Sequence, residues 1–182
     1  MNELIILGID PGTKIMGYGI IKVLNSKPDL ISMGVFNYSK ISDHYLRLEK
    51  IFIDTLGLID NYHPDELAIE APFFGKNVQS MLKLGRAQGI AISAALSRQI
   101  PISEYAPRKI KLSITGQGAA SKEQVAAFLK SILHFDEIPR NLDATDGLAA
   151  AVCHFYQRTN IAKGKSFKGW DDFVKKNPER IK

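Results

Sequence analysis

The chain has 182 residues, of which 45% are hydrophobic and 24% charged, and it contains a single cysteine. A chain of this length buries a sizeable core in one globular domain, so it needs neither a disulfide nor a structural metal to fold. We expect no secretory leader, since no charged region followed by an apolar one stands at the N-terminus, and no apolar run approaches the ~18 residues of a membrane helix. We therefore expect a cytoplasmic protein rather than a secreted or membrane protein.

The net charge of +5 is concentrated near the C-terminal end. Residues 1–100 carry 10 basic and 10 acidic residues, and residues 101–157 carry 6 of each, whereas residues 158–182 carry 8 basic and 3 acidic residues. This last segment lacks helical periodicity. A solvated appendage and an arm that contacts phosphates both fit its composition. The sequence thus predicts one globular domain over residues 1–158 and a basic tail over residues 159–182.

The first forty residues favour an antiparallel meander. Glu3–Asp10 is an apolar run that stops at Pro-Gly, which is typical of a buried central strand. Two further strands, Tyr18–Leu24 and Leu30–Tyr38, are separated by the turn-forming sequence Asn-Ser-Lys-Pro-Asp at 25–29.

Helices and strands alternate in the rest of the chain, which predicts parallel pairing through right-handed crossovers. We expect an α/β fold with a mixed five-stranded sheet, three strands antiparallel and two parallel to the first, flanked by helices. The predicted elements are a helix over Ser42–Asn61 with Ser42 as N-cap, a strand at Asp65–Glu70, a helix over Asn77–Arg98, a strand at Pro101–Tyr105, a helix from the capping box at Ser121 to about Leu133, and a helix from Asn141 to about Arg158.

Two of the predicted strands end in acidic residues. Asp10 ends the first strand and Glu70 ends the fourth. A right-handed crossover places these strands side by side, ~5 Å apart, with both carboxylates at the sheet edge where α/β proteins bind ligands. The alternative is a pair of solvated strand-end acids.

A second acidic pair lies at the start of the last predicted helix. Asp143 and Asp146 are three residues apart, so they share one face of its first turn. The alanine-rich sequence that follows, residues 149–152, allows the helix to press closely on the sheet and to aim both acids at its edge. Acids at a helix N-terminus also simply complement the helix dipole, by about 0.3–1 kcal/mol each.

Together the four carboxylates suggest a set of oxygen ligands for Mg²⁺ or Mn²⁺. Clustered carboxylates repel one another unless a cation offsets them, and two ions about 4 Å apart activate water for phosphodiester hydrolysis. His134 and His154 are the nearest alternative ligands or bases. His154 follows Asp146 by just over two helical turns, so we interpret it as a structural histidine.

With these residues placed, residues 4–158 resemble the RuvC family of Holliday-junction endonucleases, which have an RNase H-like fold. Each motif that carries the resemblance is weak alone, and the order and spacing of all of them are specific. They are Leu7-Gly-Ile-Asp10-Pro-Gly-Thr, Gly17-Tyr18-Gly19, Ile69-Glu70, Phe73-Phe74, Asn77, Lys83-Leu84-Gly85-Arg86-Ala87-Gln88-Gly89, Tyr105-Ala106-Pro107, Lys111, Gly116-Gln117-Gly118-Ala119, Lys122 and Asp143-Ala144-Thr145-Asp146-Gly147-Leu148-Ala149.

The resemblance implies a nuclease domain that acts as a homodimer and nicks two strands of a four-way DNA junction symmetrically. It implies Mg²⁺ at Asp10, Glu70, Asp143 and Asp146, with Mn²⁺ as a substitute and two ions per site. It also implies that Lys111 and Lys122 lie near the scissile phosphate, that Phe73 stacks at the opened junction, and that a RuvA–RuvB branch-migration complex is a partner. For Phe73 and Phe74, core packing is the alternative.

The resemblance further assigns the helix over Asn77–Arg98 as the dimer contact. Leu82, Ala87, Ile90, Ala94 and Leu96 lie among Gly85 and Gly89, so the helix has one face for the sheet and a second for a partner. No family function maps onto the tail.

Three other functions remain open from the sequence. Gly8-Ile-Asp-Pro-Gly-Thr13 also resembles the first phosphate loop of actin-like ATPases and sugar kinases, although the chain has no second such motif. An RNase H-like nuclease that acts on RNA, as in the YqgF group, usually lacks the segment with Lys111 and Lys122. A binding module without nuclease activity would not need all four carboxylates.

Overall fold

The structure, a computed structural model, describes residues 3–72 and 77–163. The strands are β1 (Leu4–Asp10), β2 (Ile15–Leu24), β3 (Lys27–Asn37), β4 (Glu66–Glu70) and β5 (Ile102–Tyr105). In the described residues they form one five-stranded sheet in the order β3-β2-β1-β4-β5. The pairs β1–β2 and β2–β3 are antiparallel, and the pairs β1–β4 and β4–β5 are parallel. The predicted mixed sheet is confirmed.

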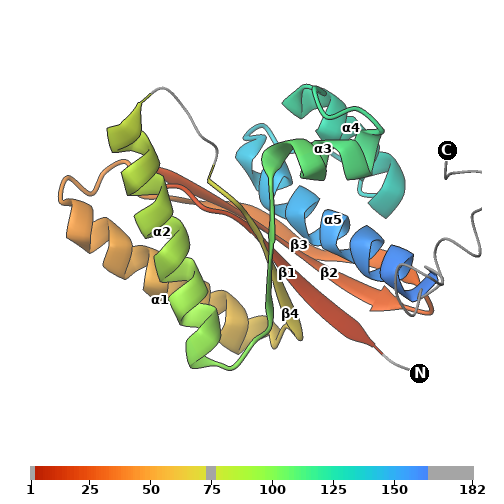
Figure 1. Cartoon of the computed structure of the whole chain (residues 1–182), viewed down its shortest axis with the longest axis horizontal. Coiled ribbons are helices and arrows are strands. Elements are labelled where there is room, and N and C mark those ends of the chain that lie inside the picture. Colours follow the sequence, from red (N-terminus) through yellow and green to blue (C-terminus); the bar gives the residue numbers. More distant parts are fainter. Residues whose placement is uncertain (1–2, 73–76, 164–182) are drawn as a thin grey trace, which may run out of the picture.

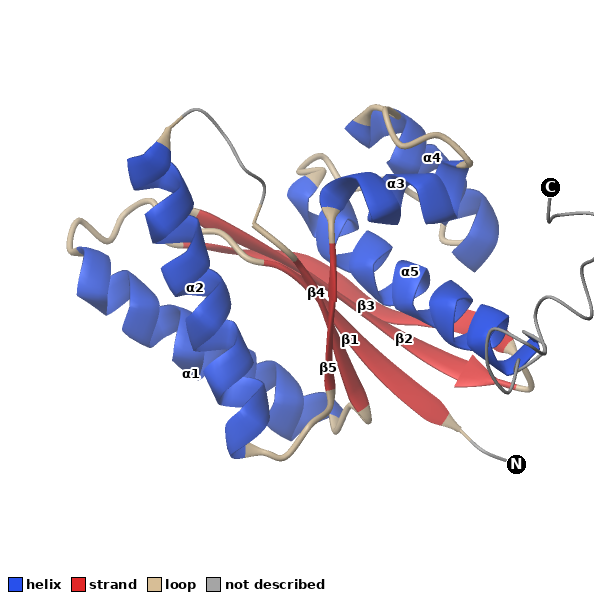
Figure 2. Ribbon diagram, viewed as in Figure 1, coloured by secondary structure: helices blue, strands red, loops and turns tan. Residues whose placement is uncertain are grey.

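Helices cover both faces of the sheet, as Figures 1 and 2 show. Helices α1 and α2 lie on one side, and α3, α4 and α5 lie on the other. Within the described part of the chain, no helix is long and apolar enough to cross a membrane. The helices are α1 (His44–Tyr62), α2 (Val78–Ser97), α3 (Pro107–Thr115), α4 (Lys122–Leu133) and α5 (Asp143–Lys163).

The helix starts follow their capping residues, with one correction. The capping box of Ser121 and Gln124 at the start of α4 is confirmed. Helix α1, however, is capped by Asp43 and not by Ser42, because the Asp43 carboxylate accepts the backbone N–H groups of Tyr45 and Leu46. Serine and aspartate are both good N-caps. The path of the preceding loop therefore decides which of the two residues takes the N-cap position.

Helix α3 was not among the predicted elements. It is only 9 residues long, too short for a clear apolar period. Its boundary signals are nevertheless in the sequence, since Pro107 occupies the first turn and Gly116 ends the helix with a left-handed φ of 74°. At the other end of the domain, α5 reaches Lys163 and so does not end near Arg158 as predicted.

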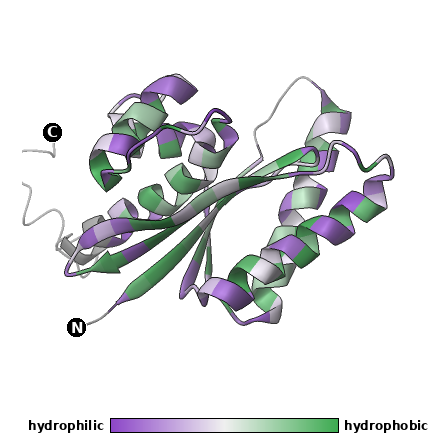
Figure 3. Ribbon diagram, turned by 180° about the vertical axis from the view of Figure 1, so that it is seen from behind, coloured by the Kyte–Doolittle hydropathy of each residue, from purple (hydrophilic) through white to green (hydrophobic). Residues whose placement is uncertain are grey.

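Two hydrophobic cores lie on the two faces of the sheet. Along β1, Leu7 and Ile9 belong to the core beneath α1 and α2, and Ile6 belongs to the core beneath α3, α4 and α5. This alternation is the two-residue period of a strand buried on both faces. The helices carry both hydrophobic and hydrophilic residues (Figure 3), and their buried hydrophobic residues belong to these two cores. Burying each large apolar side chain contributes about 1.5–3 kcal/mol.

Helix α5 lies unusually close to β1 and β2 because glycines face each other across the contact. A Cβ atom on Gly17 would come within 1.9 Å of the Asp143 carbonyl oxygen, and one on Gly147 would come within 2.5 Å of the Tyr18 Cα. The alanines predicted to allow this approach, Ala149 to Ala151, are at most 1% exposed. The helix N-terminus is therefore held against the strand end that carries Asp10.

We predict that Gly147→Ala lowers the free energy of unfolding by at least about 2 kcal/mol, because the new methyl group meets strand backbone that cannot move aside. Gly57→Ala in α1 is the control, since nothing lies within 4 Å of a Cβ built there. That substitution should stabilise the protein by about 0.5–1 kcal/mol. Urea unfolding measures both, and equal midpoints for the two variants would contradict the packing argument.

Candidate active site

Asp10 and Glu70 lie side by side at the carboxyl ends of neighbouring parallel strands. Strands β1 and β4 pair with Gly8 opposite Ala68 and Ile9 opposite Ile69, so the next residues in register are Asp10 and Glu70. The predicted proximity of the two carboxylates is confirmed. It follows from the β1–β4 crossover, which makes these two strands neighbours although sixty residues separate their acids.

Helix α5 adds the second acidic pair, and a lysine from α4 joins it. The Lys122 Nζ donates to Asp143 Oδ1 at 2.8 Å and to Asp146 Oδ2 at 2.5 Å. At the helix start, the Asn141 side chain accepts the Asp143 backbone N–H at 3.1 Å, in line with its predicted capping role. Lys122 therefore holds the two aspartates together with its ammonium group.

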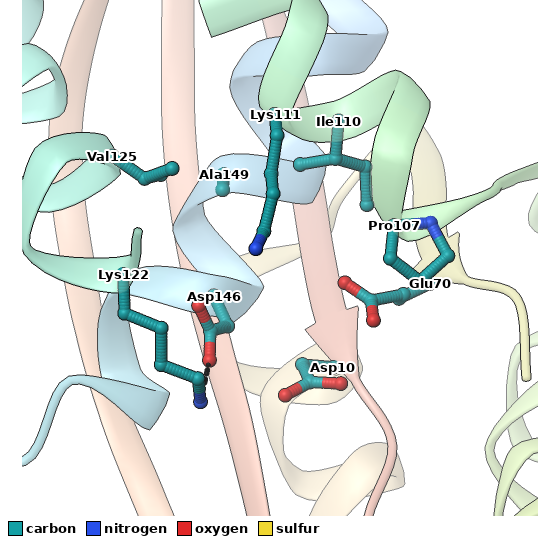
Figure 4. Close-up of a pocket in the computed structure, with 9 residues that line it drawn as sticks. All are labelled: Asp10, Glu70, Pro107, Ile110, Lys111, Lys122, Val125, Asp146 and Ala149. Carbon is teal, nitrogen blue, oxygen red and sulfur yellow. Dashed lines mark hydrogen bonds and ion pairs between the residues drawn. The ribbon is translucent and has the colours of Figure 1, made fainter. Parts of the chain in front are cut away.

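The ends of β1 and β4 and the helices α3, α4 and α5 enclose a cavity of about 280 Å³, drawn in Figure 4. Asp10, Glu70 and Asp146 line its acidic side, and Lys111 extends into it from α3. Lys111 makes no ion pair with any residue that the structure describes. The apolar residues of the wall come from α3, α4 and α5, and they are Pro107, Ile110, Val125 and Ala149. The part of this wall that α3 contributes, Pro107 and Ile110, was not predicted from the sequence because α3 itself was not predicted.

Burial and mutual repulsion make the central carboxylates reluctant to ionise. Burial, with the charge of Asp146 added, raises the pKa of Asp10 to about 7, although Lys122 acts in the opposite direction. Burial and the charge of Asp10 raise the pKa of Glu70 to about 8. Burial also raises the pKa of Asp146, although the hydrogen bond from Lys122 opposes it. The pKa of Lys122 is lowered by burial, but its bonds to both aspartates raise it on balance.

The residues of this site suit a divalent cation by their chemistry. All four acids offer carboxylate oxygen, the donor that Mg²⁺ and Mn²⁺ prefer. Burial first and neighbouring acids second raise the pKa values of Asp10 and Glu70, and a bound cation would counteract both effects. In the geometry of the described residues, no three His, Cys, Asp or Glu side chains converge enough to enclose a metal. The Lys122 ammonium occupies the space between Asp143 and Asp146.

Gln88 of α2 fixes the strand end that carries Glu70. This buried side chain donates to Glu104 Oε2 at 2.8 Å and, more weakly, to the Glu70 carbonyl at 3.4 Å. The next residue, Ala71, donates its N–H to the Tyr105 carbonyl at 2.9 Å. Sequence reasoning placed Gln88 only within a motif, and its buried polar position on an otherwise alanine-rich face was the available signal.

The remaining candidates from the sequence lie elsewhere. His154 is buried, its Nδ1 is 2.6 Å from the Tyr105 hydroxyl, and its Nε2 pairs with Glu66 at the opposite end of β4 from Glu70. This confirms a structural histidine. His134 is the left-handed residue that ends α4 and does not line the cavity. Phe73 and Phe74 lie outside the described residues.

The chain is similar to proteins of known family over most of its length. A "Crossover junction endodeoxyribonuclease RuvC" of Christiangramia forsetii is 65% identical over 100% of this chain and 94% of its own length. The protein of the same name from Bacteroides fragilis is 60% identical over 100% of this chain and 98% of its own length. The structure of Thermus thermophilus RuvC in complex with a Holliday junction substrate has a TM-score of 0.79, is 31% identical, and spans 86% of this chain and 96% of that one.

The sheet order and the acidic strand ends thus define an RNase H-like protein, as the resemblance implied. The family model described as crossover junction endodeoxyribonuclease RuvC matches residues 6–154. The chain belongs to the RuvC family of crossover junction endodeoxyribonucleases.

We predict that the metal-free protein becomes less stable as pH rises from 5 to 8. Asp10 and Glu70 have pKa values near 7 and 8 in the fold and near 4 when unfolded. The folded chain therefore binds more protons in this window, and the free energy of unfolding falls with pH. Measured in EDTA, the melting temperature should be several degrees lower at pH 8 than at pH 5. A loss of 1 kcal/mol in the free energy of unfolding corresponds to about 2–4 °C for a chain of this size.

The Asp10→Asn variant is the control for this experiment. It removes the acid that both repels Glu70 and titrates itself, so its melting temperature should depend less on pH. Burial lowers the pKa of His154, which makes a contribution of opposite sign, and the comparison of the variant with the parent cancels it. Mg²⁺ should raise the parent's melting temperature most at pH 8. Identical pH slopes for the two proteins would contradict the assignment.

Proposed function

We propose that the protein resolves four-way DNA junctions by metal-dependent hydrolysis of two symmetrically placed phosphodiester bonds, in DNA recombination and repair. The observation that carries the proposal is that Asp10, Glu70 and Asp146 line one cavity together with two lysines, with Asp143 joined to them through Lys122. Family membership and the relative in complex with a Holliday junction substrate support the choice of DNA junction as substrate.

In this proposal the four carboxylates hold Mg²⁺, with Mn²⁺ as a substitute and two ions per site. When bound, such ions lower the pKa of the attacking water and stabilise the leaving oxygen, which yields 5′-phosphate and 3′-hydroxyl ends. Lys111 stabilises the charge that develops on the phosphate, and Lys122 turns its ammonium from the aspartates toward the phosphate oxygens. The apolar wall formed by Ile110, Val125 and Ala149 excludes water and strengthens these interactions.

Phe73 completes the proposed site by stacking on a base of the opened junction. Stacking of this kind is worth ~1–3 kcal/mol and does not depend on sequence. The assignment rests on the family motif. We therefore expect loss of this aromatic ring to slow cleavage more than it weakens binding.

The proposal includes a homodimer, because two symmetric nicks need two active sites related by a two-fold axis. Helix α2 offers a surface for it. Its outward face includes Val78, Leu82 and Leu96, which are 63%, 54% and 60% exposed. Between them lie Gly85 and Gly89, where a Cβ would meet nothing within 4 Å. We refer to these five residues as the α2 stripe.

Family membership alone supports two further parts of the proposal. A RuvA–RuvB branch-migration complex is the proposed protein partner, and the bacterial cytoplasm, where the DNA substrate is, is the proposed location.

We predict that Asp10→Asn and Asp146→Asn each abolish junction cleavage and preserve junction binding. Each substitution removes a metal-holding charge while it keeps the shape of the side chain. The assay compares a labelled four-way junction with a linear duplex of the same sequence, in Mg²⁺ and in EDTA. The parent should give paired nicks on the junction alone and only in Mg²⁺.

Asp29→Asn is the matched control, because Asp29 is an exposed acid on β3 opposite Lys22, at the far end of the hairpin from Asp10. It should cleave at the parent's rate. Comparable nicking by Asp10→Asn and the parent would refute the site assignment. Cleavage of RNA or hydrolysis of ATP by the parent, without junction cleavage, would keep the fold and overturn the function.

We also predict that Leu82→Glu converts the dimer into monomers. A charge in the middle of the α2 stripe would be buried without a partner in the dimer. Phe128→Glu is the control, since Phe128 is an apolar residue of α4 with a similar exposure of 47%. Sedimentation velocity should give the parent's mass for the control and half that mass for Leu82→Glu. A dimeric Leu82→Glu variant would place the contact elsewhere.

A further inference from the structure

A second cavity, of about 460 Å³, opens beside the turn that follows Asp10. The first cavity is formed by α3, α4 and α5, whereas this one is formed by the β1–β2 turn together with α1 and α2, the helices on the opposite face of the sheet. Thr13 and Lys14 of the turn, Arg47 of α1, and Ser80 and Lys83 of α2 line it. We refer to these five residues as the turn pocket.

The turn pocket gathers three cations that lack a counterion. No carboxylate lines the cavity. Lys14, Arg47 and Lys83 form no ion pair with any residue in the described ranges, whereas Lys22, Lys50, Arg98, Lys122 and Arg158 each pair with an acid. Like charges brought together from three separate segments repel one another. An anionic ligand would remove this repulsion.

The position of Arg47 is set before any ligand arrives. Its Nε donates to the Ile41 carbonyl at 2.5 Å, which fixes the guanidinium plane, and this is its only side-chain hydrogen bond within the described residues. The terminal nitrogens are thus available to a ligand. Arginine with such a fixed fork suits the oxygens of a phosphate group.

Hydroxyl groups and a helix start complete the donor set. Ser80 lies in the first turn of α2, where the helix dipole favours an anion although the Asn77 side chain accepts the Ser80 N–H, and Thr13 lines the same cavity from the turn. Lysine, arginine, hydroxyl groups and helix N-termini are the groups with which proteins bind the sugar-phosphate backbone of DNA. The pocket therefore has the chemistry of a phosphate site and lacks that of a metal site.

The distance of the turn pocket from Asp10 limits which phosphate of the DNA it can bind. Lys14 follows Asp10 by four residues, so their Cα atoms are at most about 14 Å apart, and one DNA strand advances about 3.4 Å per nucleotide. We infer that the turn pocket binds a backbone phosphate of the cleaved DNA strand, within about four nucleotides of the bond that is cut. This inference rests on the proposed function and adds a second anchoring point outside the carboxylate site.

The test measures junction binding by the full chain in EDTA at several salt concentrations, for the parent, Lys83→Ala and Lys14→Ala/Lys83→Ala. Loss of one phosphate contact reduces the slope of log K against log[salt] by about 1. Lys83→Ala should bind roughly five- to tenfold more weakly with such a change in slope, and the double variant more weakly still. Lys27→Ala, which removes an exposed lysine at the far end of the β2–β3 hairpin, should match the parent.

Neutral methylphosphonates placed one at a time in the cleaved strand identify the phosphate. At one position within about four nucleotides of the cut, the substitution should weaken binding by the parent but weaken Lys83→Ala no further. Two results would overturn the inference. One is that a methylphosphonate at every position weakens Lys83→Ala as much as it weakens the parent. The other is that Lys83→Ala and the double variant have the same slope of log K against log[salt] as the parent. Sedimentation of the variants verifies that α2 still supports the parent's oligomeric state.

Parental cleavage in Mg²⁺, measured on the same junction, separates the two proposals. A parent that cuts the junction while the lysine variants bind as it does leaves the function standing and removes the turn pocket. A parent that does not cut it overturns both.

Discussion

The arrangement of the site depends on how closely the backbone of α5 approaches β1 and β2. An ordinary side chain at Gly17 or Gly147 would hold the helix away from the sheet, because Cβ atoms there would overlap main-chain atoms of the opposite element. With hydrogen atoms in their place, the first turn of α5 lies against the end of β1. Asp146 is thereby brought to the strand-end pair of Asp10 and Glu70. A contact between main chains leaves little freedom for adjustment, so it fixes the relative positions of acids from three elements.

The same approach has an electrostatic cost. Acids drawn into a cavity with an apolar wall lose hydration and repel one another, which is why the pKa values of Asp10 and Glu70 rise to about 7 and 8. Lys122 offsets part of this repulsion through its contacts with Asp143 and Asp146. The fold therefore holds together carboxylates whose mutual repulsion lowers the stability of the folded protein. Conflict between local stability and geometry is a common property of functional sites.

Much of this arrangement could be predicted from the sequence, because it depends on local rules. The adjacency of Asp10 and Glu70 follows from strand pattern and crossover handedness, and the shared face of Asp143 and Asp146 follows from helical spacing. The start of α4 follows from a capping box. The contact between Lys122 and the two aspartates could not be predicted, since it depends on how α4 packs beside α5.

Helix α3 shows a second reason for failure. Its 9 residues are too few for periodicity to identify, although Pro107 and Gly116 mark its ends. Because α3 was missed, so was the apolar wall that it contributes at Ile110. The choice of Asp43 over Ser42 as the cap of α1 is similar, since both side chains can cap and only the path of the loop decides. Local signals thus identified the four acids, the family motifs supplied Lys111 and Lys122, and neither indicated the apolar surface that encloses them.

The end of β1 lies between two cavities of opposite character, and this gives the strand end a role beyond carrying Asp10. On the α3–α5 side the lining combines three carboxylates with two lysines, and on the α1–α2 side every charged residue of the lining is a cation. The few residues between Asp10 and Lys14 separate them. A polyanion held at the basic cavity has its neighbouring phosphates directed toward carboxylates that would repel it without cations. In the proposed mechanism, the basic cavity supplies affinity and the acidic cavity supplies a requirement for metal. DNA binding and the requirement for metal are thereby assigned to opposite sides of one turn. The separation prevents the cations of one cavity from neutralising the carboxylates of the other.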